Sequence, residues 1–329
     1  MLPVGDVASL IVGVLALWFG ARFLVTGASR IAGAAGISAL VVGLTVVAFG
    51  TSAPEIVVST GAALEGRGDV AVGNVVGSNV FNLGVILGLV AVIAPFRVSE
   101  PLLRRDVLAM AASTVVAVAV LANTLVSRLE GAVLLALLAG YLAALVIAIK
   151  NGDEAAEPTG DSSEATDGGT APAAADGTGR DVRLGLEAGR TVAGLAIVIV
   201  GGRVLVDAAV GLALSVGISE WVVGATIVAA GTSLPELVTS VVAARQGDTG
   251  IAAGNVVGSS VFNVLGVLGL AAAARPLAVD PAVFLALGWL AAVTAFATVV
   301  LATGRQLTRL EGAALVAFGT AYWVGSAIL

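Results

Sequence analysis

Two glutamates lie within long apolar segments, and each ends a copy of the same six-residue motif. Glu55 ends Gly50–Glu55, which reads GTSAPE, and Glu236 ends Gly231–Glu236, which reads GTSLPE. An ionised carboxylate inside a bilayer is costly and by default marks an ion pathway. A neutral glutamate bonded to a neighbouring helix would explain one such residue better than two at equivalent positions. We therefore predict that both glutamates are cation ligands.

The proline of each motif should expose further oxygen atoms beside the glutamate. Proline lacks a backbone N–H and clashes with the preceding turn, and the carbonyls that it frees need another partner. We expect those carbonyls at Ala48 and Phe49 and, in the second copy, at Ala229 and Ala230. The alternative, a kinked helix used only for packing, leaves the repeated carboxylate unexplained. The hydroxyls expected to line the same gap are those of Thr51, Ser52, Thr232 and Ser233.

A second repeated motif carries amide and hydroxyl groups. It reads GNVVGSNVFN at 73–82 and GNVVGSSVFN at 254–263. Its first Asn, first Ser and last Asn are spaced four apart and form one polar stripe on a helix, while its glycines suit close helix packing. The motif has no nucleotide-binding lysine. The predicted ligands here are Ser78, Asn82, Ser259 and Asn263, with Asn74 and Asn255 expected to brace broken backbone.

Composition restricts the chemistry of such a site to oxygen ligands. The chain has no Cys and no His, which excludes disulfides, Cys/His metal centres and a Ser-His-Asp triad. Oxygen ligands suit Na⁺, Mg²⁺ and Ca²⁺, and Mg²⁺ fits less well because it dehydrates reluctantly. Two carboxylates balance one Ca²⁺, which takes about 6–8 oxygens. The same acceptors could hold Na⁺ ions at separate subsites, and competition for shared carboxylates leads to exchange.

The elements that must position these residues are membrane-spanning helices. The chain of 329 residues is 58% hydrophobic and 12% charged, against about 25% charged in soluble domains. Its apolar runs do not alternate with polar residues, as the strands of an outer-membrane barrel do. The net charge of −6 and the lack of a basic run exclude nucleic-acid binding. The sequence predicts ten helices, at roughly 7–29, 38–64, 70–94, 103–125, 129–149, 187–213, 220–244, 251–274, 281–303 and 310–328.

A polar stretch at 150–186 separates two groups of five helices, at 1–149 and 187–329. It is acidic and poor in large apolar residues, so we predict a disordered tether. The alternative, a regulatory calcium site in this stretch, lacks EF-hand spacing.

The two groups repeat each other in sequence at a constant offset of 181 residues. Between Val41 and Leu89, 29 of 49 positions are identical to their counterparts in the second group. Because five is an odd number, the second group should enter the membrane from the opposite side, which predicts an inverted-topology repeat with its site near the midplane. Predicted inside loops hold eleven Lys or Arg and outside loops three, so both termini are expected outside and the linker in the cytoplasm. The N-terminus lacks the basic region of a cleaved signal peptide.

The paired motifs resemble the two α-repeats of the sodium/calcium exchanger family, within the cation/Ca²⁺ exchanger superfamily. The resemblance extends over nearly the whole chain and implies a short prokaryotic member that works by alternating access, in which the first and sixth spans slide as gating helices. Some members carry a carboxylate where this chain has Asn82 or Asn263. The ligands that the resemblance implies are Thr51, Glu55, Ser78, Asn82, Thr232, Glu236, Ser259, Asn263 and the carbonyls of Ala48 and Ala229.

The predicted function is antiport of Na⁺ against Ca²⁺ across a prokaryotic plasma membrane, with both ions as substrates and no cofactor. No obligate protein partner is evident from the sequence. The alternatives are Ca²⁺/H⁺ or other cation exchange, and a passive cation channel, which needs weak binding and a continuous pore. An intramembrane enzyme would need a diacid or a Ser–Lys centre, and the single lysine, Lys150, lies outside the predicted spans. We therefore predict a transporter and not an enzyme.

Overall fold

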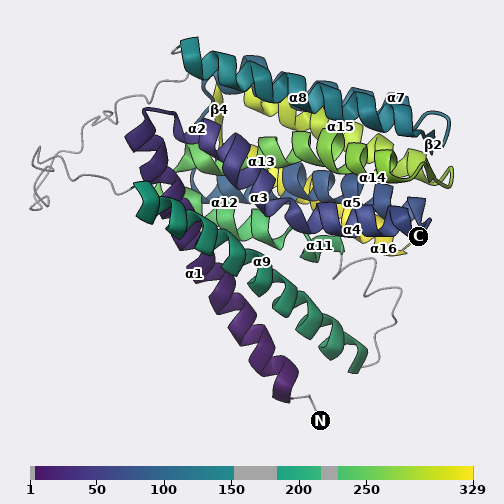
Figure 1. Cartoon of the computed structure of the whole chain (residues 1–329), viewed down its shortest axis with the longest axis horizontal. Coiled ribbons are helices and arrows are strands. Elements are labelled where there is room, and N and C mark those ends of the chain that lie inside the picture. The colour runs from purple at the N-terminus through teal and green to yellow at the C-terminus, as the bar shows by residue number, and fades with distance from the viewer. Residues whose placement is uncertain (1–3, 152–183, 216–228, 329) are drawn as a thin grey trace, which may run out of the picture.

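The computed structural model describes residues 4–151, 184–215 and 229–328, and they are almost entirely helical (Figure 1). The first half comprises α1 (Val4–Ala35), α2 (Ala39–Val42), η1 (Gly43–Val47), α3 (Ala48–Thr51), α4 (Ala53–Leu64), α5 (Gly68–Val80), η2 (Phe81–Ile86), α6 (Leu87–Ile93), β1 (Phe96–Arg97), η3 (Leu102–Val107), α7 (Leu108–Val120), β2 (Leu125–Val126) and α8 (Arg128–Asn151). The second half comprises α9 (Leu184–Ser215), α11 (Ala229–Gly231), α12 (Leu234–Gln246), α13 (Thr249–Val261), η5 (Phe262–Leu268), α14 (Gly269–Ala274), β3 (Leu277–Ala278), α15 (Val283–Ala302), β4 (Gln306–Leu307) and α16 (Arg309–Ile328).

The helices suit a protein that crosses a membrane several times. Judged by length and composition, six described helices can cross a bilayer, or seven if a bent pair is counted as one span. All ten predicted helices overlap described helices. However, the first part of the helix expected at 220–244 lies outside the described residues, as does nearly all of the linker expected at 150–186. Ten spans in two inverted repeats therefore remain a prediction.

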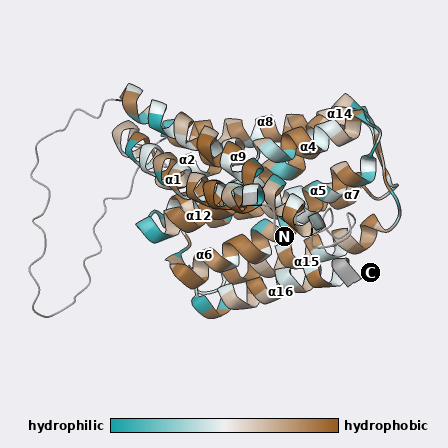
Figure 2. Ribbon diagram, turned by 90° about the horizontal axis from the view of Figure 1, so that it is seen from below, coloured by the Kyte–Doolittle hydropathy of each residue, from teal (hydrophilic) through white to brown (hydrophobic). Residues whose placement is uncertain are grey.

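Apolar side chains cover much of the outer surface of the bundle. Val57, Val115 and Val192 are 70%, 68% and 67% exposed, and hydrophobic residues predominate along the helices in Figure 2. An exposed apolar surface of this extent would be unusual on a soluble monomer. It fits helices that face lipid, so helix association must depend on close packing between them.

Glycines allow that close packing at matching places in the two halves. A Cβ atom on Gly88 of α6 would lie 2.6 Å from the carbonyl oxygen of Gly312 of α16, and one on Gly131 of α8 would lie 2.8 Å from that of Gly269 of α14. Gly88 and Gly131 precede Gly269 and Gly312 by 181 residues. The backbones of these helices therefore touch, as small residues permit in membrane proteins.

Two small strand pairs tie the loops together at opposite ends of the bundle. β1 pairs antiparallel with β4, and β2 pairs antiparallel with β3. A capping box follows β2, where Glu130 accepts from Ser127, and another follows β4, where Glu311 accepts from Thr308. These boxes satisfy the first N–H groups of α8 and α16. The strands are not predicted from the sequence, since two residues give no periodic signal.

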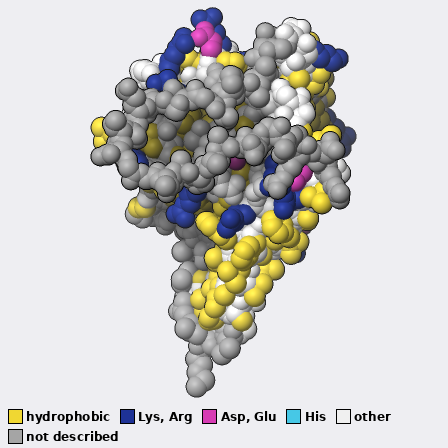
Figure 3. Space-filling model, turned by 90° about the vertical axis from the view of Figure 1, so that its left-hand side faces the viewer, with side chains coloured by type: hydrophobic (Ala, Val, Ile, Leu, Met, Phe, Trp, Pro, Cys, Tyr) yellow, Lys and Arg dark blue, Asp and Glu magenta, His cyan; other side chains and the backbone are white. Residues whose placement is uncertain are grey.

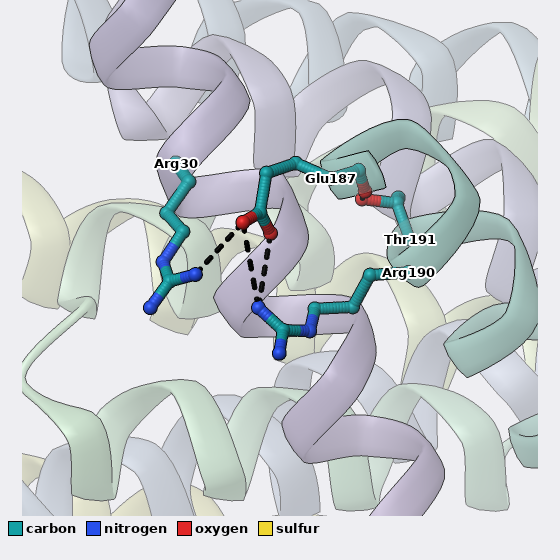
Figure 4. A network of polar contacts seen from close by, with 4 residues as sticks. All are labelled: Arg30, Glu187, Arg190 and Thr191. Atoms are coloured by element: carbon teal, nitrogen blue, oxygen red, sulfur yellow. Dashed lines mark hydrogen bonds and ion pairs between the residues drawn. The ribbon is translucent and has the colours of Figure 1, made fainter. Parts of the chain in front are cut away.

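The long helices α1 and α9 lie side by side and leave the bundle at a steep angle (Figure 1). Near their middle, Gly13 faces Leu205 and Gly194 faces Leu24, which is the same contact repeated at the 181-residue offset. At one end the Arg30 Nη1 atom lies 2.7 Å from Glu187 Oε1, and Arg190 Nη1 lies 3.1 Å from Glu187 Oε2 (Figure 4). Basic side chains gather around this end, at which α8 ends and α9 begins (Figure 3). The ion pair thus joins the two long helices at a positively charged end.

Candidate cation site

The site is built where two helices are interrupted at the same point of the repeated motif. The helix through α2, η1 and α3 bends by 44° before it continues as α4. Ser52 between them has φ −80° and ψ 6°, and Ser233 before α12 has φ −90° and ψ 8°. The proline of each motif follows two residues later, in the first turn, where its missing N–H costs no helix bond. The interruptions place Glu55 and Glu236 in the first turns of α4 and α12.

Each glutamate is held by a serine from the other half of the chain. Ser52 Oγ donates to Glu236 Oε1 at 3.1 Å, and Ser233 Oγ donates to Glu55 Oε1 at 3.0 Å. Both carboxylates are completely buried. Residues 184 and 178 positions apart in sequence therefore meet at one centre, as the repeated motif predicts. The serines are donors to carboxylates in this structure, and their role as cation ligands stays a prediction.

The threonines of the motif also cross between the halves. Thr51 Oγ1 donates to Asn255 Oδ1 at 3.1 Å, and Thr232 Oγ1 donates to Asn74 Oδ1 at 3.2 Å. The amide nitrogen of Asn255 reaches back to the Glu236 carbonyl at 3.3 Å. Asn255 therefore bonds the backbone of the first turn of α12 and in addition contacts the opposite threonine, whereas Asn74 bonds the side chains of Thr232 and Ser59. Bracing of the broken backbone itself by either asparagine stays a prediction.

Several buried polar atoms at this centre have no protein hydrogen-bond partner. They are one carboxylate oxygen of each glutamate, both amide atoms of two asparagines, and one hydroxyl: Glu55 Oε2, Glu236 Oε2, Asn82 Oδ1 and Nδ2, Asn263 Oδ1 and Nδ2, and Ser78 Oγ. An unpartnered buried polar group is expensive, and the unpartnered oxygens are hard ligands of the kind that Na⁺ and Ca²⁺ prefer. The donor set therefore fits an oxygen-coordinated cation substrate.

Wide helical turns carry the two asparagines with unpartnered amides. Asn82 lies in η2 and Asn263 in η5, and both segments are π-helices. A π-helical turn bonds each residue to the fifth one along instead of the fourth, and such turns occur frequently at functional sites. From the sequence alone, ordinary helix is predicted here, and the wider turns are not.

The backbone carbonyl expected at Ala48 is present at the site but is not unpartnered. It accepts the Ser52 N–H at 3.1 Å, and the hydroxyls of Thr51 and Ser259 lie 3.4 and 3.5 Å away. The proline frees the carbonyl four residues before it, that of Gly50, and not the one at 48. Ala229 begins α11. Its carbonyl as a ligand stays a prediction, as does that of Ala48.

One side of the site is more open than the other. Asn255 and Thr51 are fully buried, whereas Asn74 is partly exposed and Thr232 is 8% exposed. Thr232 also lines a cavity of about 440 Å³ between α4, α9 and α12. An ion pair within α9, between Arg203 Nε and Asp207 Oδ2 at 3.7 Å, lies on the cavity wall. Thr232 thus borders both the site and this cavity.

Two further buried polar groups were not singled out from the sequence. Asn79, whose counterpart is Ser260, is 1% exposed and its side chain has no protein hydrogen bond. Asp106 is fully buried and bonded by Arg105 at 2.8 Å and by the Tyr141 hydroxyl at 3.1 Å. The Asn79/Ser260 mismatch between the repeats was a visible signal. Nothing in the sequence marks Asp106 as buried, because Arg104, Arg105 and Asp106 read as a surface charge cluster.

The described residues contain no group of three or more Asp or Glu side chains close enough to hold a metal ion. Among the described residues, Glu55 and Glu236 are the acidic side chains at this centre. Because the asparagines are uncharged, these two carboxyl groups can supply at most two negative charges. This is enough to compensate one Ca²⁺ or two Na⁺.

Comparison with known proteins gives consistent matches over most of the chain. The family model described as sodium/calcium exchanger protein matches residues 6–147 and 187–326. The inner membrane protein YrbG of Escherichia coli is 40% identical over 280 residues, covering 83% of this chain and 81% of that protein. The sodium/calcium exchanger MaX1 of Methanosarcina acetivorans is 32% identical over 351 residues, covering 96% of each.

A solved structure shares the same fold. The sodium-calcium exchanger NCX_Mj, soaked with 2.5 mM Na⁺ and 0.1 mM Ca²⁺, superposes with a TM-score of 0.82 at 28% sequence identity. The match covers 98% of this chain and 99% of that one. The all-helical, polytopic membrane fold is thus shared with an exchanger.

Proposed function

Since the chain belongs to the sodium/calcium exchanger protein family, we propose that it is a secondary antiporter that moves Ca²⁺ in exchange for Na⁺. Transport would proceed by alternating access to one site between the two halves of the chain. A prokaryotic plasma membrane is the proposed location, with both termini outside and the linker in the cytoplasm. The basic end of the bundle in Figure 3 would then face the cytoplasm.

One observation supports this proposal above the others. Glu55 and Glu236 are buried, and each has one oxygen bonded to a serine of the opposite half and one oxygen unpartnered. A cation that is bound by both carboxylates is bound by both halves of the chain. When the two halves rearrange, both would therefore stay in contact with the ion, as alternating access requires.

The same two carboxylates would account for exchange. Ca²⁺ and Na⁺ would both use Glu55 and Glu236, so one ion must leave before the other binds. An empty site would hold two uncompensated negative charges in a low-dielectric region, which disfavours return without a cation. Glu55, Glu236, Asn82 and Asn263 are the proposed core ligands, and the proposed further ligands are Ala48, Thr51, Ser52, Ser78, Ala229, Thr232, Ser233 and Ser259.

The test is transport by the purified protein in liposomes. Proteoliposomes loaded with Na⁺ would be diluted into Na⁺-free medium, and entry of ⁴⁵Ca²⁺ would be followed. A matched set would carry a pH gradient in place of the Na⁺ gradient. We expect uptake to follow the Na⁺ gradient and to slow strongly when Na⁺ is equal on both sides.

Other outcomes would change the proposal in defined ways. Uptake that follows only the pH gradient would replace Na⁺ with H⁺ as the coupling ion. Uptake without either gradient, or current in planar bilayers without a counter-ion, would contradict antiport and favour a channel. Silence towards Ca²⁺ under all conditions would contradict calcium as the substrate.

A further inference from the structure

Asn74 and Asn255 touch the site without contributing an unpartnered atom to it. Asn255 accepts from Thr51 through Oδ1, and through Nδ2 it donates to Ser240 Oγ at 2.9 Å and to the Glu236 carbonyl at 3.3 Å. Asn74 accepts from Thr232 through Oδ1 and donates to Ser59 Oγ at 2.9 Å. Both side-chain amides are therefore fixed in orientation, because hydrogen bonds hold the oxygen and the nitrogen of each. Amides fixed in this way can in turn fix the threonine hydroxyls.

A threonine hydroxyl has one proton, and the group that accepts it decides where the lone pairs point. Three acceptors lie within reach of the Thr51 hydroxyl, namely Asn255 Oδ1 at 3.1 Å, the Ala48 carbonyl oxygen at 3.4 Å and the Glu236 carboxylate. The shorter bond to Asn255 leaves the Ala48 carbonyl without that donor. It also leaves the lone pairs of the Thr51 oxygen available to another group.

We propose that Asn255 and Asn74 are positioning residues of the cation site. Each accepts the hydroxyl proton of the threonine from the opposite half, and so presents the threonine oxygen to the cation. Without Asn255, Thr51 donates to the Ala48 carbonyl or to the Glu236 carboxylate, and either bond occupies two proposed ligands at once. This inference rests on the proposed function, because it assigns a role towards the cation that the antiporter binds.

The two positions are not equivalent in their surroundings. Asn255 and Thr51 are fully buried, whereas Asn74 is partly exposed. Water can replace a lost hydrogen bond at the exposed pair but not at the buried one. Loss of Asn255 should therefore weaken cation binding more than loss of Asn74 does.

The experiment measures equilibrium binding of ⁴⁵Ca²⁺ to the purified full-length protein. We expect Asn255→Ala to raise the Kd for Ca²⁺ by roughly 3- to 10-fold, the value of one or more hydrogen bonds. Asn74→Ala should raise it by less than about threefold. The matched control is Ser260→Ala on the same helix, since the Ser260 hydroxyl is buried but bonds only to its own helix, at the Val256 carbonyl 2.9 Å away. The control should stay within about twofold of the wild type.

A double-mutant cycle separates positioning from general support. If Asn255 acts through the Thr51 hydroxyl, Asn255→Ala should change the Kd by less than about twofold in a Thr51→Val background. The same factor in both backgrounds, or an equal effect of Ser260→Ala, would overturn the inference. If Asn255→Ala does not fold, as gel filtration would show, Asn74→Ala with Thr232→Val tests the same idea. A wild type that binds no Ca²⁺ contradicts the proposed function itself, whereas a binding wild type with unaffected asparagine variants contradicts only the positioning role.

Discussion

Contacts at the centre of the molecule repeat at the 181-residue offset, whereas contacts at the two ends of the α1/α9 helix pair do not. At the centre, each contact between Ser52 and Glu236 or between Thr51 and Asn255 has a counterpart at the 181-residue offset. At the ends of α1 and α9 the correspondence fails. Arg30 pairs with Glu187 at one end, but the counterparts at the other end are Gly211 and Asp6.

Under the proposed alternating-access mechanism, the difference separates two requirements on the protein. A site that must serve both states equally well gains from ligands that are equivalent in the two halves. Ends that differ give the two states different free energies, because an ion pair present at one end stabilises whichever arrangement keeps it. Among the described residues no ion pair joins Asp6 to another side chain. Asp6 instead faces Gly211, which has no side chain to pair with it. We therefore expect the end at Arg30 to resist separation more than the end at Asp6.

The largest expected effect tests the equivalence at the centre. Glu55→Gln and Glu236→Gln should each abolish Ca²⁺ transport, with loss of roughly 100-fold or more, because a buried charge that compensates the cation is removed. Since each carboxylate has one oxygen bonded to a serine of the opposite half and one oxygen unpartnered, the two variants should agree within about threefold of each other. Initial rates of ⁴⁵Ca²⁺ uptake into Na⁺-loaded proteoliposomes would measure both.

The control for these variants is Glu65→Gln, which changes an exposed carboxylate after α4. It should transport like the wild type. Transport by either buried variant at the wild-type rate would contradict the ligand assignment. A large loss in only one of them would contradict the equivalence of the two halves.

The repeated motifs predict that these residues meet, because their signal is chemical and appears twice, whereas their role as ligands stays a prediction. Glu55 and Glu236 meet the serines of the opposite motif, and Asn255 bonds the backbone of the first turn of α12. The sequence could not predict the π-helical turns at Asn82 and Asn263, since helix-forming residues do not distinguish a wide turn from an ordinary one.

The ends of α1 and α9 were beyond sequence reasoning for a different reason. Arg30 and Glu187 are 157 residues apart, and they meet only because of how two long helices cross. Neither residue lies in the repeated motif. The offset relates Arg30 to a glycine, so the repeat carries no sign of the pair. A contact that breaks a repeat is visible only in three dimensions.

A second prediction concerns the end of the α1/α9 pair at which Arg30 and Glu187 form an ion pair. Arg30→Gln should open it by removing the bond between α1 and α9, while Arg190 stays paired with Glu187 so that the carboxylate is not stranded. Because the chain has no Cys, a single introduced thiol reports on each end. The positions are Ala28, 1% exposed, and Ala208, 4% exposed. Labelling of Ala28→Cys by a small maleimide should rise roughly two- to fivefold, the value of a partly exposed ion pair.

The other end of the α1/α9 pair, at Asp6 and Gly211, supplies the control for that measurement. Asp6→Asn should leave the labelling of both thiols unchanged, and Arg30→Gln should leave that of Ala208→Cys unchanged. Equal opening of both ends by Arg30→Gln would mean that the ion pair stabilises the helix pair as a whole and does not distinguish its ends.

A third prediction adds an ion pair at the end of the α1/α9 pair that contains Asp6 and Gly211. Gly211→Arg places a guanidinium opposite Asp6, whose Oδ2 lies 3.0 Å from the position of a Cβ on Gly211. The flexible carboxylate can move by the few tenths of an ångström required. The new ion pair should slow labelling of Ala208→Cys by about twofold. Gly211→Gln is the matched uncharged variant, and an equal slowing there would show that bulk and not charge closes the end.

The smallest expected effect concerns a second bond that α1 makes near Arg30. Ser29 Oγ donates to Asp248 Oδ1 at 3.2 Å, in the turn between α12 and α13. Burial raises the pKa of Asp248 above its ordinary value of 3.8, and the bond from Ser29 only partly opposes this. The folded protein therefore holds the Asp248 proton more tightly than the unfolded chain does. It follows that this residue's contribution to stability falls as pH rises from 3.8 through the raised pKa.

Asp248→Asn removes this titration but keeps an oxygen that can accept from Ser29. The melting temperature of the variant in detergent, relative to the wild type, should therefore rise with pH across that window and stay constant above it. We expect a change of about 1–3 °C. Glu65→Gln should show no such trend, which would separate Asp248 from the other carboxylates. A difference that falls with pH would mean that the ionised form of Asp248 is the one that holds α1 to the core. The bond from Ser29 and the Arg30–Glu187 ion pair would then act together to hold this end of α1.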